Sequence, residues 1–302
     1  MHHRTPCRFP SLATIALTSV IQSPAIMTNT TPARQYALGS TEAEHDRLIH
    51  QAARLAPFTE RFFRDAGIGP GQRVLDVGSG VGDVAMLVAK LVGPSGEVVG
   101  VERNPGTIAR ARARVAEADL PNVSFTQSDV SQLSSSKPYD AVVGRFILMF
   151  LPDPLAVLRF LAQLVRPGGV VAFHEISWAP FLLLAKRFPL WSAGVSLAHE
   201  AFLSSGANTE MGFALHQLFQ EAGLPAPTMS LEMPLGNDPE FTRWIPDVIG
   251  SLMPLVHQFN LPLKPLGDLN TLPERIHAEV TASNSVVTWM ALVGAWSRKP
   301  AT

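Results

Sequence analysis

Strand and helix patterns alternate along residues 73–176, and this alternation constrains the fold more than any other feature of the sequence. Short runs rich in valine are each followed by a segment with apolar residues at helical spacing. Such alternation is typical of βαβ units, which build a parallel sheet covered by helices on both faces. The expected strands are Arg73–Val77, Glu97–Glu102, Val123–Gln127, Tyr139–Gly144 and a fifth that follows the turn Arg166-Pro167-Gly168-Gly169 and runs through Ile176. The expected helices are Gly82–Val92, Pro105 to about Ala118, and Pro154–Val165.

The segments on either side of this region are expected to be mainly helical. Thr41 with Glu44 forms a capping-box signature, and Pro57 is expected to break or kink the helix that follows. A second helical piece ends at Gly67. Beyond Ile176 the pattern predicts helices near Phe181–Leu203 and Thr209–Ala222, a strand at Thr228–Met233, a proline-punctuated helical stretch at Pro239–Ser283 and a last strand at Val286–Trp296.

The first 34 residues differ in composition from the rest of the chain. They hold no acidic residue, contain Arg4, Arg8 and Arg34, and include a short apolar run from Leu12 to Ile21. Three interpretations stay open: a transit peptide, a weak secretory signal, and an unstructured leader that precedes a true start at Met27. We exclude this leader from the fold and expect a cytoplasmic protein, with organelle targeting or secretion left open.

Composition excludes several classes of function. The 302 residues carry a formal net charge of -1, so nothing in the overall charge favours nucleic acid or an anionic membrane as a partner. The single cysteine, Cys7, rules out an intramolecular disulfide framework and a cysteine-rich zinc cluster. No apolar run approaches the roughly 18 residues that a membrane-spanning helix needs. We therefore expect a soluble protein.

The run VLDVGSGVGD, from Val74 to Asp83, follows the first strand and carries the candidate cofactor site. Gly78, Gly80 and Gly82 spell G-x-G-x-G, which lets the backbone turn sharply and approach a ligand closely. Glu102 lies about 20 residues further, at the end of the second strand, where a carboxylate accepts ribose hydroxyls. Ligands of open parallel sheets bind beyond the carboxyl ends of the strands. The nucleoside half of a cofactor is expected there.

The details of this loop favour S-adenosylmethionine over a nicotinamide dinucleotide. Dinucleotide sites prefer G-x-G-x-x-G, with a helix N-terminus facing the pyrophosphate, whereas here the third glycine comes one residue early. Asp76 and Asp83 flank the loop and would repel a pyrophosphate, but they suit a ligand with a positive amino group and a sulfonium. Asp129, just past the third strand, is placed to accept a hydrogen bond from an adenine amino group.

In their order and spacing, five segments resemble the successive motifs of class I S-adenosylmethionine-dependent methyltransferases, in particular the small-molecule branch that includes quinone-biosynthesis and natural-product enzymes. The segments are VLDVGSGVGD, VVGVERNP, FTQSDV, YDAVVGRFILMFLPDP and LVRPGGVVAFHE. The resemblance covers about residues 36–177. It implies a Rossmann-like, doubly wound and mostly parallel seven-stranded α/β sheet, with a helical lid at 35–70, a cofactor-binding core at 71–177, and a helical cap with the last strands at 178–302. It also implies a role in secondary metabolism.

The resemblance further implies which residues bind the cofactor. The methionyl portion would contact Asp76, Gly78, Gly80 and Arg145, the ribose Glu102, and the adenine Asp129 and Val130. Gly82 and Arg103 are further cofactor-binding candidates, and Tyr36 and Gln51 resemble positions that close over the cofactor. Simpler roles stay open for three of these residues. Glu102 would be a solvated cap before Pro105, Asp129 the N-cap of a short helix, and Arg145 an ion-pair partner of Asp153.

Methyl transfer is a direct displacement that needs the nucleophile in line with the methyl group at about 3 to 3.5 Å and water excluded. For a hydroxyl acceptor a general base helps. His174 and Glu175, at the end of the fifth strand, are the candidate catalytic residues. His199, Glu200 and His216 come next, and no metal site is expected because no ligand spacing such as H-E-x-x-H occurs.

The cap is rich in large apolar residues, which predicts a hydrophobic or aromatic small molecule as the methyl acceptor. Trp178, His199 and Phe202 are the candidate substrate residues. Two other readings are kept: a non-catalytic S-adenosylmethionine-binding partner or sensor protein, and an NAD-dependent oxidoreductase. The sequence leaves a homodimer open.

Overall fold

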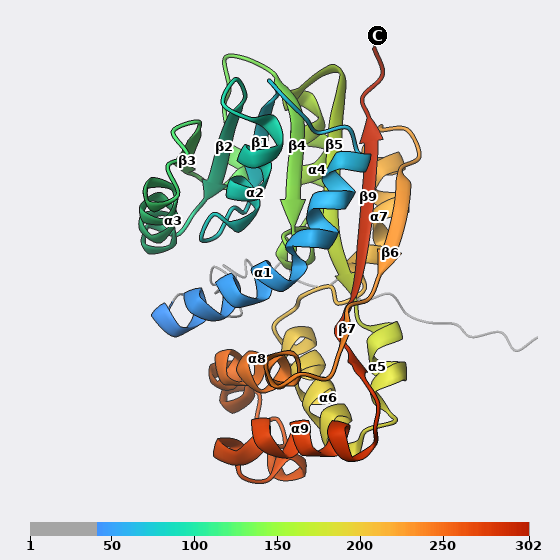
Figure 1. The fold of residues 1–302 in the computed structure, drawn as a ribbon. Coiled ribbons are helices and arrows are strands. Elements are labelled where there is room, and N and C mark those ends of the chain that lie inside the picture. Colours follow the sequence, from blue (N-terminus) through green and yellow to red (C-terminus); the bar gives the residue numbers. More distant parts are fainter. Residues whose placement is uncertain (1–40, 302) are drawn as a thin grey trace, which may run out of the picture. The chain divides into compact units, whose positions relative to one another are not determined.

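A seven-stranded sheet forms the centre of the protein (Figure 1). The computed structural model describes residues 41–301. The strand order is β3-β2-β1-β4-β5-β9-β6, and β9 alone runs in the direction opposite to the other strands. The strands are β1 Arg73–Val77, β2 Glu97–Glu102, β3 Val123–Gln127, β4 Tyr139–Arg145, β5 Val165–Ser177, β6 Thr228–Glu232 and β9 Ala291–Arg298. The expected Rossmann-like, mostly parallel sheet of seven strands is therefore confirmed.

The strand order reverses between β1 and β4, and this reversal decides where a ligand can bind. From β1 the chain continues outward through β2 to β3, and it then returns to pair β4 with the other edge of β1. Connections that leave in opposite directions open a crevice at the carboxyl ends of the two strands. Apart from residues at their ends, both strands are buried. Their buried residues are apolar except for Asp76.

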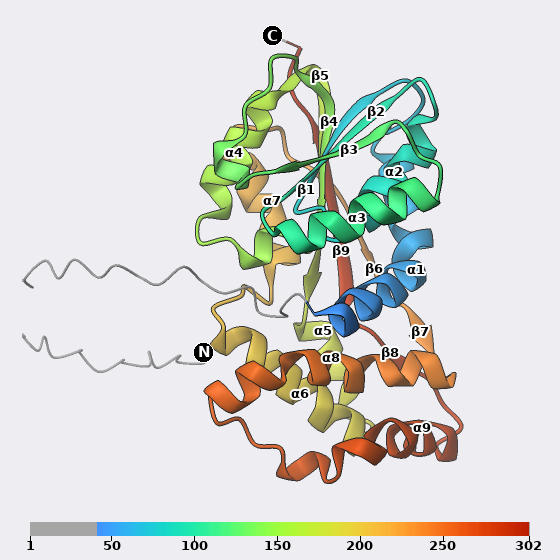
Figure 2. The same ribbon diagram turned by 90° about the vertical axis from the view of Figure 1, so that its left-hand side faces the viewer.

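Helices cover both faces of the sheet (Figure 2). One face packs against α1 Glu42–Asp65, α2 Asp83–Val92 and α3 Pro105–Glu117, and the other against α4 Pro154–Leu164 and α7 Met211–Glu221. Aliphatic side chains fill the layer under α2 and α3, because the branched residues of the strands alternate between the two faces. The sheet is buried on both sides, as its continuous apolar strands predict.

The remaining helices gather beyond the carboxyl ends of β4 and β5 (Figure 1). They are α5 Ala179–Ala185, α6 Pro189–Ser204, α8 Pro239–Gln258 and α9 Leu272–Ala282, with short 3-10 turns and the two-stranded ribbon of β7 Leu235–Gly236 and β8 Val287–Thr288. Within residues 41–301, no helix is both long and apolar enough to cross a membrane.

The boundaries in this region differ from those that the sequence pattern predicts. The single helix expected at residues 181–203 is two helices, because Pro189 has no N–H to donate and begins α6 instead. The stretch expected at 239–283 is divided where Asn260 adopts a left-handed backbone, with φ of 52°. The expected last strand is interrupted after β8, since Trp289 N donates to Pro234 O outside the main sheet.

Of the break or kink expected at Pro57, the break is wrong: α1 continues through Pro57, and the second helical piece expected after it is part of the same helix. Thr41 caps its start, and its hydroxyl oxygen accepts a hydrogen bond from Glu44 N at 3.2 Å, as the capping-box signature predicts. The Glu44 side chain does not complete the box, because it turns to Arg47 instead. The helix changes direction along its length (Figure 1), which is how a helix accommodates an internal proline.

A buried polar network ties α1 to α8. Glu44 and Arg47 form a two-pronged ion pair with distances of 2.6 and 2.7 Å, and their side chains are 2% and 7% exposed. Ser251 of α8 donates to Glu44, and Trp244 of α8 donates to Gln51 Oε1 at 2.9 Å. Arg47 also donates to Gln51 Oε1. Helix α1 is thus fixed to α8, about 200 residues away in the chain.

Removal of Arg47 is expected to destabilise the fold strongly. In Arg47→Met the Glu44 carboxylate stays buried without its cation, and such a loss costs about 3 to 5 kcal/mol. The matched control is Arg61→Met, because Arg61 pairs with Glu232 while 56% exposed, and an exposed pair contributes at most about 1 kcal/mol. Urea unfolding measures both changes. Equal losses of unfolding free energy would contradict the prediction.

Candidate functional site

The loop between β1 and α2 has a backbone that requires glycine. Gly78, Gly80 and Gly82 have φ angles of 66°, 52° and 89°, which L side chains rarely adopt. A Cβ on Gly78 would lie 2.6 Å from Ile147 Cδ1, whereas a Cβ on Gly80 would meet nothing within 4 Å. The three glycines therefore shape the loop, and open space lies beside the middle one.

Asp76 presents a carboxylate oxygen with no protein partner. Its side chain is 1% exposed near the end of β1, and Oδ2 has no hydrogen bond to any described residue. Burial raises the pKa of Asp76 to about 8, although the nearby Arg145 charge and a hydrogen bond from the Ala85 backbone act in the opposite direction. An unpartnered buried carboxylate is costly, so its place beside the glycine loop points to a ligand with a donor group.

Arg145 brings the opposite charge to the same region from the end of β4. It forms no ion pair with any carboxylate of residues 41–301, and its Nη1 donates to Thr59 Oγ1 at 3.2 Å. The pairing with Asp153 that the sequence left open does not occur, because Asp153 caps α4 by accepting from Ala156 N at 2.9 Å. Burial lowers the pKa of Arg145, while the charges of Asp83 and Asp76 oppose that effect.

Asp83 has a partner within the protein, whereas the sequence predicts that both acids beside the loop suit a positively charged ligand. It forms an ion pair with Arg114 at 2.8 Å, and both side chains are 16% exposed. Its charge is therefore largely balanced by α3. Of the two acids that flank the glycines, Asp76 alone has a buried oxygen without a hydrogen-bond partner among the described residues.

The acids at the ends of β2 and β3 have partly satisfied carboxylates. Glu102 Oε1 accepts from the backbone N–H of Arg103 and Asn104, each at 2.9 Å, which leaves Oε2 without a donor among the described residues. Asp129 Oδ1 accepts from Ser131 N at 2.9 Å and Ser131 Oγ at 2.6 Å, and these bonds lower the pKa of Asp129. Asp129 therefore does cap a short 3-10 turn, Val130–Gln132, and its second oxygen has no such partner.

The fold thus brings most of the predicted cofactor residues to one edge of the sheet. Asp76, Glu102, Asp129 and Arg145 lie at or just past the carboxyl ends of β1 to β4, with Arg103 exposed and Val130 half-buried beside them. Gln51 lies on α1, where Arg47 and Trp244 both donate to its side-chain oxygen. Tyr36 lies outside the described residues.

Three contributors to this edge were not predicted. Ser79 lies between two of the glycines, is 5% exposed, and has an Oγ without a partner in the described residues. Its position inside the glycine motif could have identified it from the sequence. Ile147 packs over Gly78, and Thr59 holds Arg145, but both depend on contacts between distant segments.

His174 and Glu175 point to opposite faces of β5, as adjacent strand residues must. His174 is 1% exposed, its Nδ1 lies 3.4 Å from Thr59 Oγ1, and its ring lies 5.0 Å from that of Phe62. Burial, with the Arg145 charge, lowers the pKa of His174 to about 3. A ring that stays neutral under ordinary conditions is a weak proton acceptor, so this environment does not favour His174 as a general base.

Glu175 is fully buried and holds the loop that follows β4. Its Oε1 accepts from Ile147 N at 2.9 Å and Leu148 N at 2.8 Å, and its Oε2 has no partner in the described residues. Burial raises the pKa of Glu175 to about 7, although the backbone donors act against that rise. A carboxyl with this pKa could exchange a proton near neutral pH.

The predicted substrate residues form one aromatic group. The Trp178 ring lies 5.4 Å from His199 and 5.7 Å from Phe202, and His199 Nε2 lies 3.1 Å from Thr209 Oγ1. Burial lowers the pKa of His199. Glu200 and His216 are both exposed. In the described part of the chain, no group of His, Cys, Asp and Glu is arranged to hold a metal ion.

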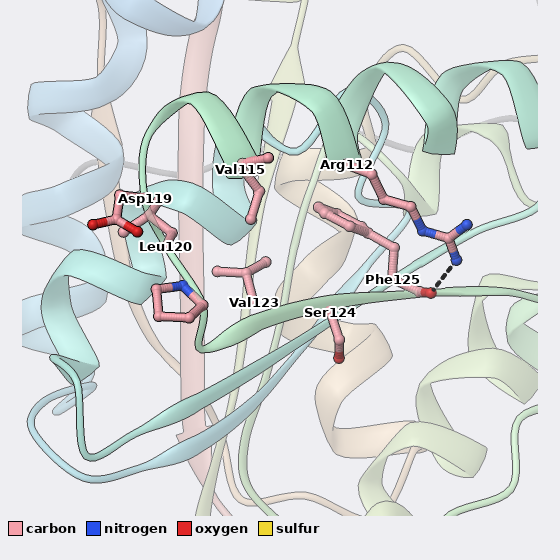
Figure 3. A pocket seen from close by; sticks show the side chains of 9 residues that line it. Arg112, Val115, Asp119, Leu120, Val123, Ser124 and Phe125 are labelled. Atoms are coloured by element: carbon pink, nitrogen blue, oxygen red, sulfur yellow. Dashed lines mark hydrogen bonds between the residues drawn. The ribbon is translucent and has the colours of Figure 1, made fainter.

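A surface hollow of about 480 Å³ lies between α3 and β3 (Figure 3). Arg112 lines the hollow, and its guanidinium donates to Phe125 O at 2.9 Å. Val123 and Leu120, at the amino-terminal end of β3, line the hollow. Asp129 follows the opposite end of β3, so we do not assign the hollow to the cofactor site.

Comparison with known proteins identifies the family. Residues 68–223 match the model of a family described as a methyltransferase domain. The chain belongs to this family. The class expected from the sequence, S-adenosylmethionine-dependent methyltransferases, is therefore confirmed, and the matched residues include the glycine loop and all four strand ends described above.

Curated relatives of this methyltransferase domain share only part of their length with it. An arsenite methyltransferase of Halobacterium salinarum is 36% identical over 118 residues, which are 38% of this chain and 30% of that protein. A ubiquinone/menaquinone biosynthesis C-methyltransferase of Ectopseudomonas mendocina is 33% identical over 42% of this chain and 50% of its own. Methyltransferase str3 of Strobilurus tenacellus is 28% identical over 69% of this chain and 74% of its own.

Solved structures share the fold at low sequence identity. A candidate methyltransferase of Bacillus halodurans C-125 has a TM-score of 0.54 at 17% identity, covering 80% of this chain and 98% of its own. The YcgJ protein of Bacillus subtilis has a TM-score of 0.53 at 15% identity, with the same coverage. At such identities the likeness supports the fold alone.

The raised pKa of Asp76 predicts a pH-dependent stability. An unfolded aspartate ionises near pH 4, whereas the folded Asp76 stays protonated until about pH 8, so the folded state loses stability as the pH rises between these values. Asp76→Asn cannot ionise and should lack this contribution. Its unfolding free energy relative to the natural protein should rise from about pH 4 and level off above about pH 8. Urea unfolding without ligand over this range measures the difference, and parallel curves would disprove the assignment.

Proposed function

We propose that the protein transfers a methyl group from S-adenosylmethionine to a hydrophobic or aromatic small molecule by direct displacement. The observation that carries the proposal is a pair of complementary groups beside the glycine loop, a carboxyl and a guanidinium. Asp76 has a free buried oxygen, and Arg145 has no carboxylate partner among the described residues. A ligand with an ammonium and a carboxylate on one carbon fits both.

The residues present fit this cofactor along its whole length. Asp76 would accept from its ammonium, and Arg145 would donate to its carboxylate. The loop of Gly78, Gly80 and Gly82 would let the backbone approach the methionyl chain, Glu102 Oε2 would accept from the ribose hydroxyls with Arg103 beside it, and Asp129 and Val130 would contact the adenine. When bound, the cofactor supplies an electrophilic methyl group on a sulfonium.

The chain itself mainly has to orient the acceptor and exclude water. We propose that α1, within residues 35–70, serves as a lid, that residues 71–177 bind the cofactor, and that residues 178–302 cap the acceptor. The aromatic group of Trp178, His199 and Phe202 supports an apolar acceptor, since such pockets are mostly apolar with few polar groups. Two relatives are named for quinone biosynthesis and for arsenite, and the quinone type suits a region rich in aromatic residues better.

For a hydroxyl acceptor we favour Glu175 over His174 as the group that takes the proton. Its Oε2 is unpartnered, and its pKa of about 7 is near the range where a base works best. A cytoplasmic location and a homodimer stay predictions without a structural argument.

The first experiment is calorimetry of the full chain with S-adenosylhomocysteine, the demethylated form of the cofactor, and with NADH. Binding of S-adenosylhomocysteine alone supports the proposal, whereas binding of NADH alone would favour an oxidoreductase. Incubation with methyl-labelled cofactor and a panel of phenols, hydroxylated quinones and arsenite then tests transfer. Binding without transfer to any acceptor would favour a non-catalytic partner or sensor.

Glu102 offers a specific test of the ribose contact. Glu102→Gln keeps the shape but removes the charge-assisted hydrogen bonds, so the affinity for S-adenosylhomocysteine should fall roughly 10- to 100-fold, as for a loss of about 1.5 to 3 kcal/mol. The matched control is Glu97→Gln at the other end of β2, where Glu97 is exposed and pairs with Arg73. Its affinity should stay unchanged. Equal affinities in the two variants, measured by calorimetry, would refute the placement of the ribose.

A further inference from the structure

A buried hydroxyl links α1 to the candidate cofactor site. Thr59 is fully buried on the face of α1 that packs on the sheet. Its Oγ1 lies 3.2 Å from Arg145 Nη1 and 3.4 Å from His174 Nδ1. The threonine therefore joins the ends of two neighbouring strands, β4 and β5, and it does so from a helix that precedes both by about 80 residues or more.

The direction of these two hydrogen bonds follows from the chemistry of the three groups. A guanidinium can only donate, so the Thr59 oxygen accepts from Arg145. In the His174 tautomer that carries its proton on Nε2, the Nδ1 atom accepts the hydroxyl proton of Thr59. Burial and the Arg145 charge lower the pKa of His174 to about 3, so the ring is neutral and has an acceptor nitrogen.

Arg145 needs such support because no acid of the described residues holds it. Its charge is felt by Asp76 and Asp83, but Asp83 pairs with Arg114 and Asp76 keeps its free oxygen. An arginine side chain has many rotamers, and freezing them on binding lowers affinity. A hydrogen bond that fixes one Nη before the ligand arrives reduces that loss.

We infer that Thr59, anchored by His174, is a positioning residue that orients the Arg145 guanidinium toward the carboxylate of the methyl donor. This inference rests on the proposed function and adds α1 to the recognition of the amino-acid half of the cofactor. It also gives His174 a role that requires a neutral ring and no contact with the acceptor.

The inference predicts a selective effect on ligands. S-adenosylhomocysteine carries the carboxylate, whereas 5′-methylthioadenosine has the same nucleoside and a thioether but lacks the amino acid. Thr59→Val keeps the volume and removes the hydroxyl. It should weaken S-adenosylhomocysteine roughly 10-fold, the equivalent of one hydrogen bond, and leave 5′-methylthioadenosine unchanged. Thr59→Ser, which restores the hydroxyl, should recover most of the lost affinity.

Thr242→Val is the matched control. Thr242 is also fully buried, and its Oγ1 also lies 3.4 Å from a histidine Nδ1, that of His277, but it belongs to α8. Thermal melting of both variants reports the general loss of stability, and only Thr59→Val should change the ratio of the two ligand affinities. His174→Leu, which removes the acceptor of the Thr59 proton, should shift the ratio in the same direction, and it keeps the test open where Thr59→Val does not fold.

Calorimetry of the full chain with the two ligands separates the outcomes. A Thr59→Val protein that binds S-adenosylhomocysteine as tightly as the natural protein would overturn the inference while leaving the proposed function intact. An equal loss for both ligands would also overturn it and indicate a structural role. A natural protein that binds neither ligand would defeat the proposed function and the inference together. In an Arg145→Gln background Thr59→Val should have no further effect, and a full additional loss would contradict the coupling.

Discussion

Two ionisable groups of opposite sign, Asp76 and Arg145, lie near the carboxyl ends of neighbouring strands without forming an ion pair. Each is costly in its place, because burial favours the neutral form of both groups, as the shifts in their pKa values reflect. They come from the paired strands β1 and β4, where the strand order reverses and where open parallel sheets bind their ligands. A zwitterionic ligand would relieve both costs, so the unsatisfied charges are better explained by binding than by folding.

Helix α1 connects this end of the sheet to α8. At one end the Glu44–Arg47 pair and Gln51 bind it to α8, and further along Thr59 reaches Arg145. An ion pair between Arg54 and Asp238, at the start of α8, lies between these contacts. Because packed helices shift together, a change in the position of α8 would reach Arg145 through one continuous helix. The acceptor and the cofactor would then be bound by parts of one connected structure.

The sequence predicts the core well and the cap poorly, for a physical reason. The bounds of β2 and β3 agree with the residues predicted, because β2 is a short apolar run and β3 alternates apolar with polar residues, and turn residues next to each strand in the chain set its ends. In the helices outside the core, tertiary contacts override local signals: α1 passes through Pro57, whereas the predicted helix at 181–203 divides at Pro189. The same residue type has opposite effects, and the difference lies in packing that no window of sequence contains.

The residues of the site likewise fall into those that the sequence predicts and those that it does not. Asp76 and Glu102 were predictable because their distances along the chain from the glycines are fixed by the length of one βαβ unit. Thr59 was not, because its partner Arg145 lies 86 residues away and no motif marks a threonine in the middle of a helix. The unsatisfied oxygen of Asp76 is likewise invisible in the sequence, since Asp83 carries the same charge beside the same glycines and is balanced by Arg114.

His174 and Glu175 show why adjacency in sequence is a poor guide to shared chemistry in a strand. Alternation sends the histidine to the α1 face and the glutamate to the loop after β4, and burial then lowers one pKa and raises the other. The histidine, neutral and held between Thr59 and Phe62, suits the support of a fixed charge. The glutamate, which fixes the amides of Ile147 and Leu148 with one oxygen and keeps the other free, is the member of the pair whose proton can be lost or gained near neutral pH. His174 and Glu175 therefore do not act as one acid-base pair, because their side chains lie on opposite faces of the sheet.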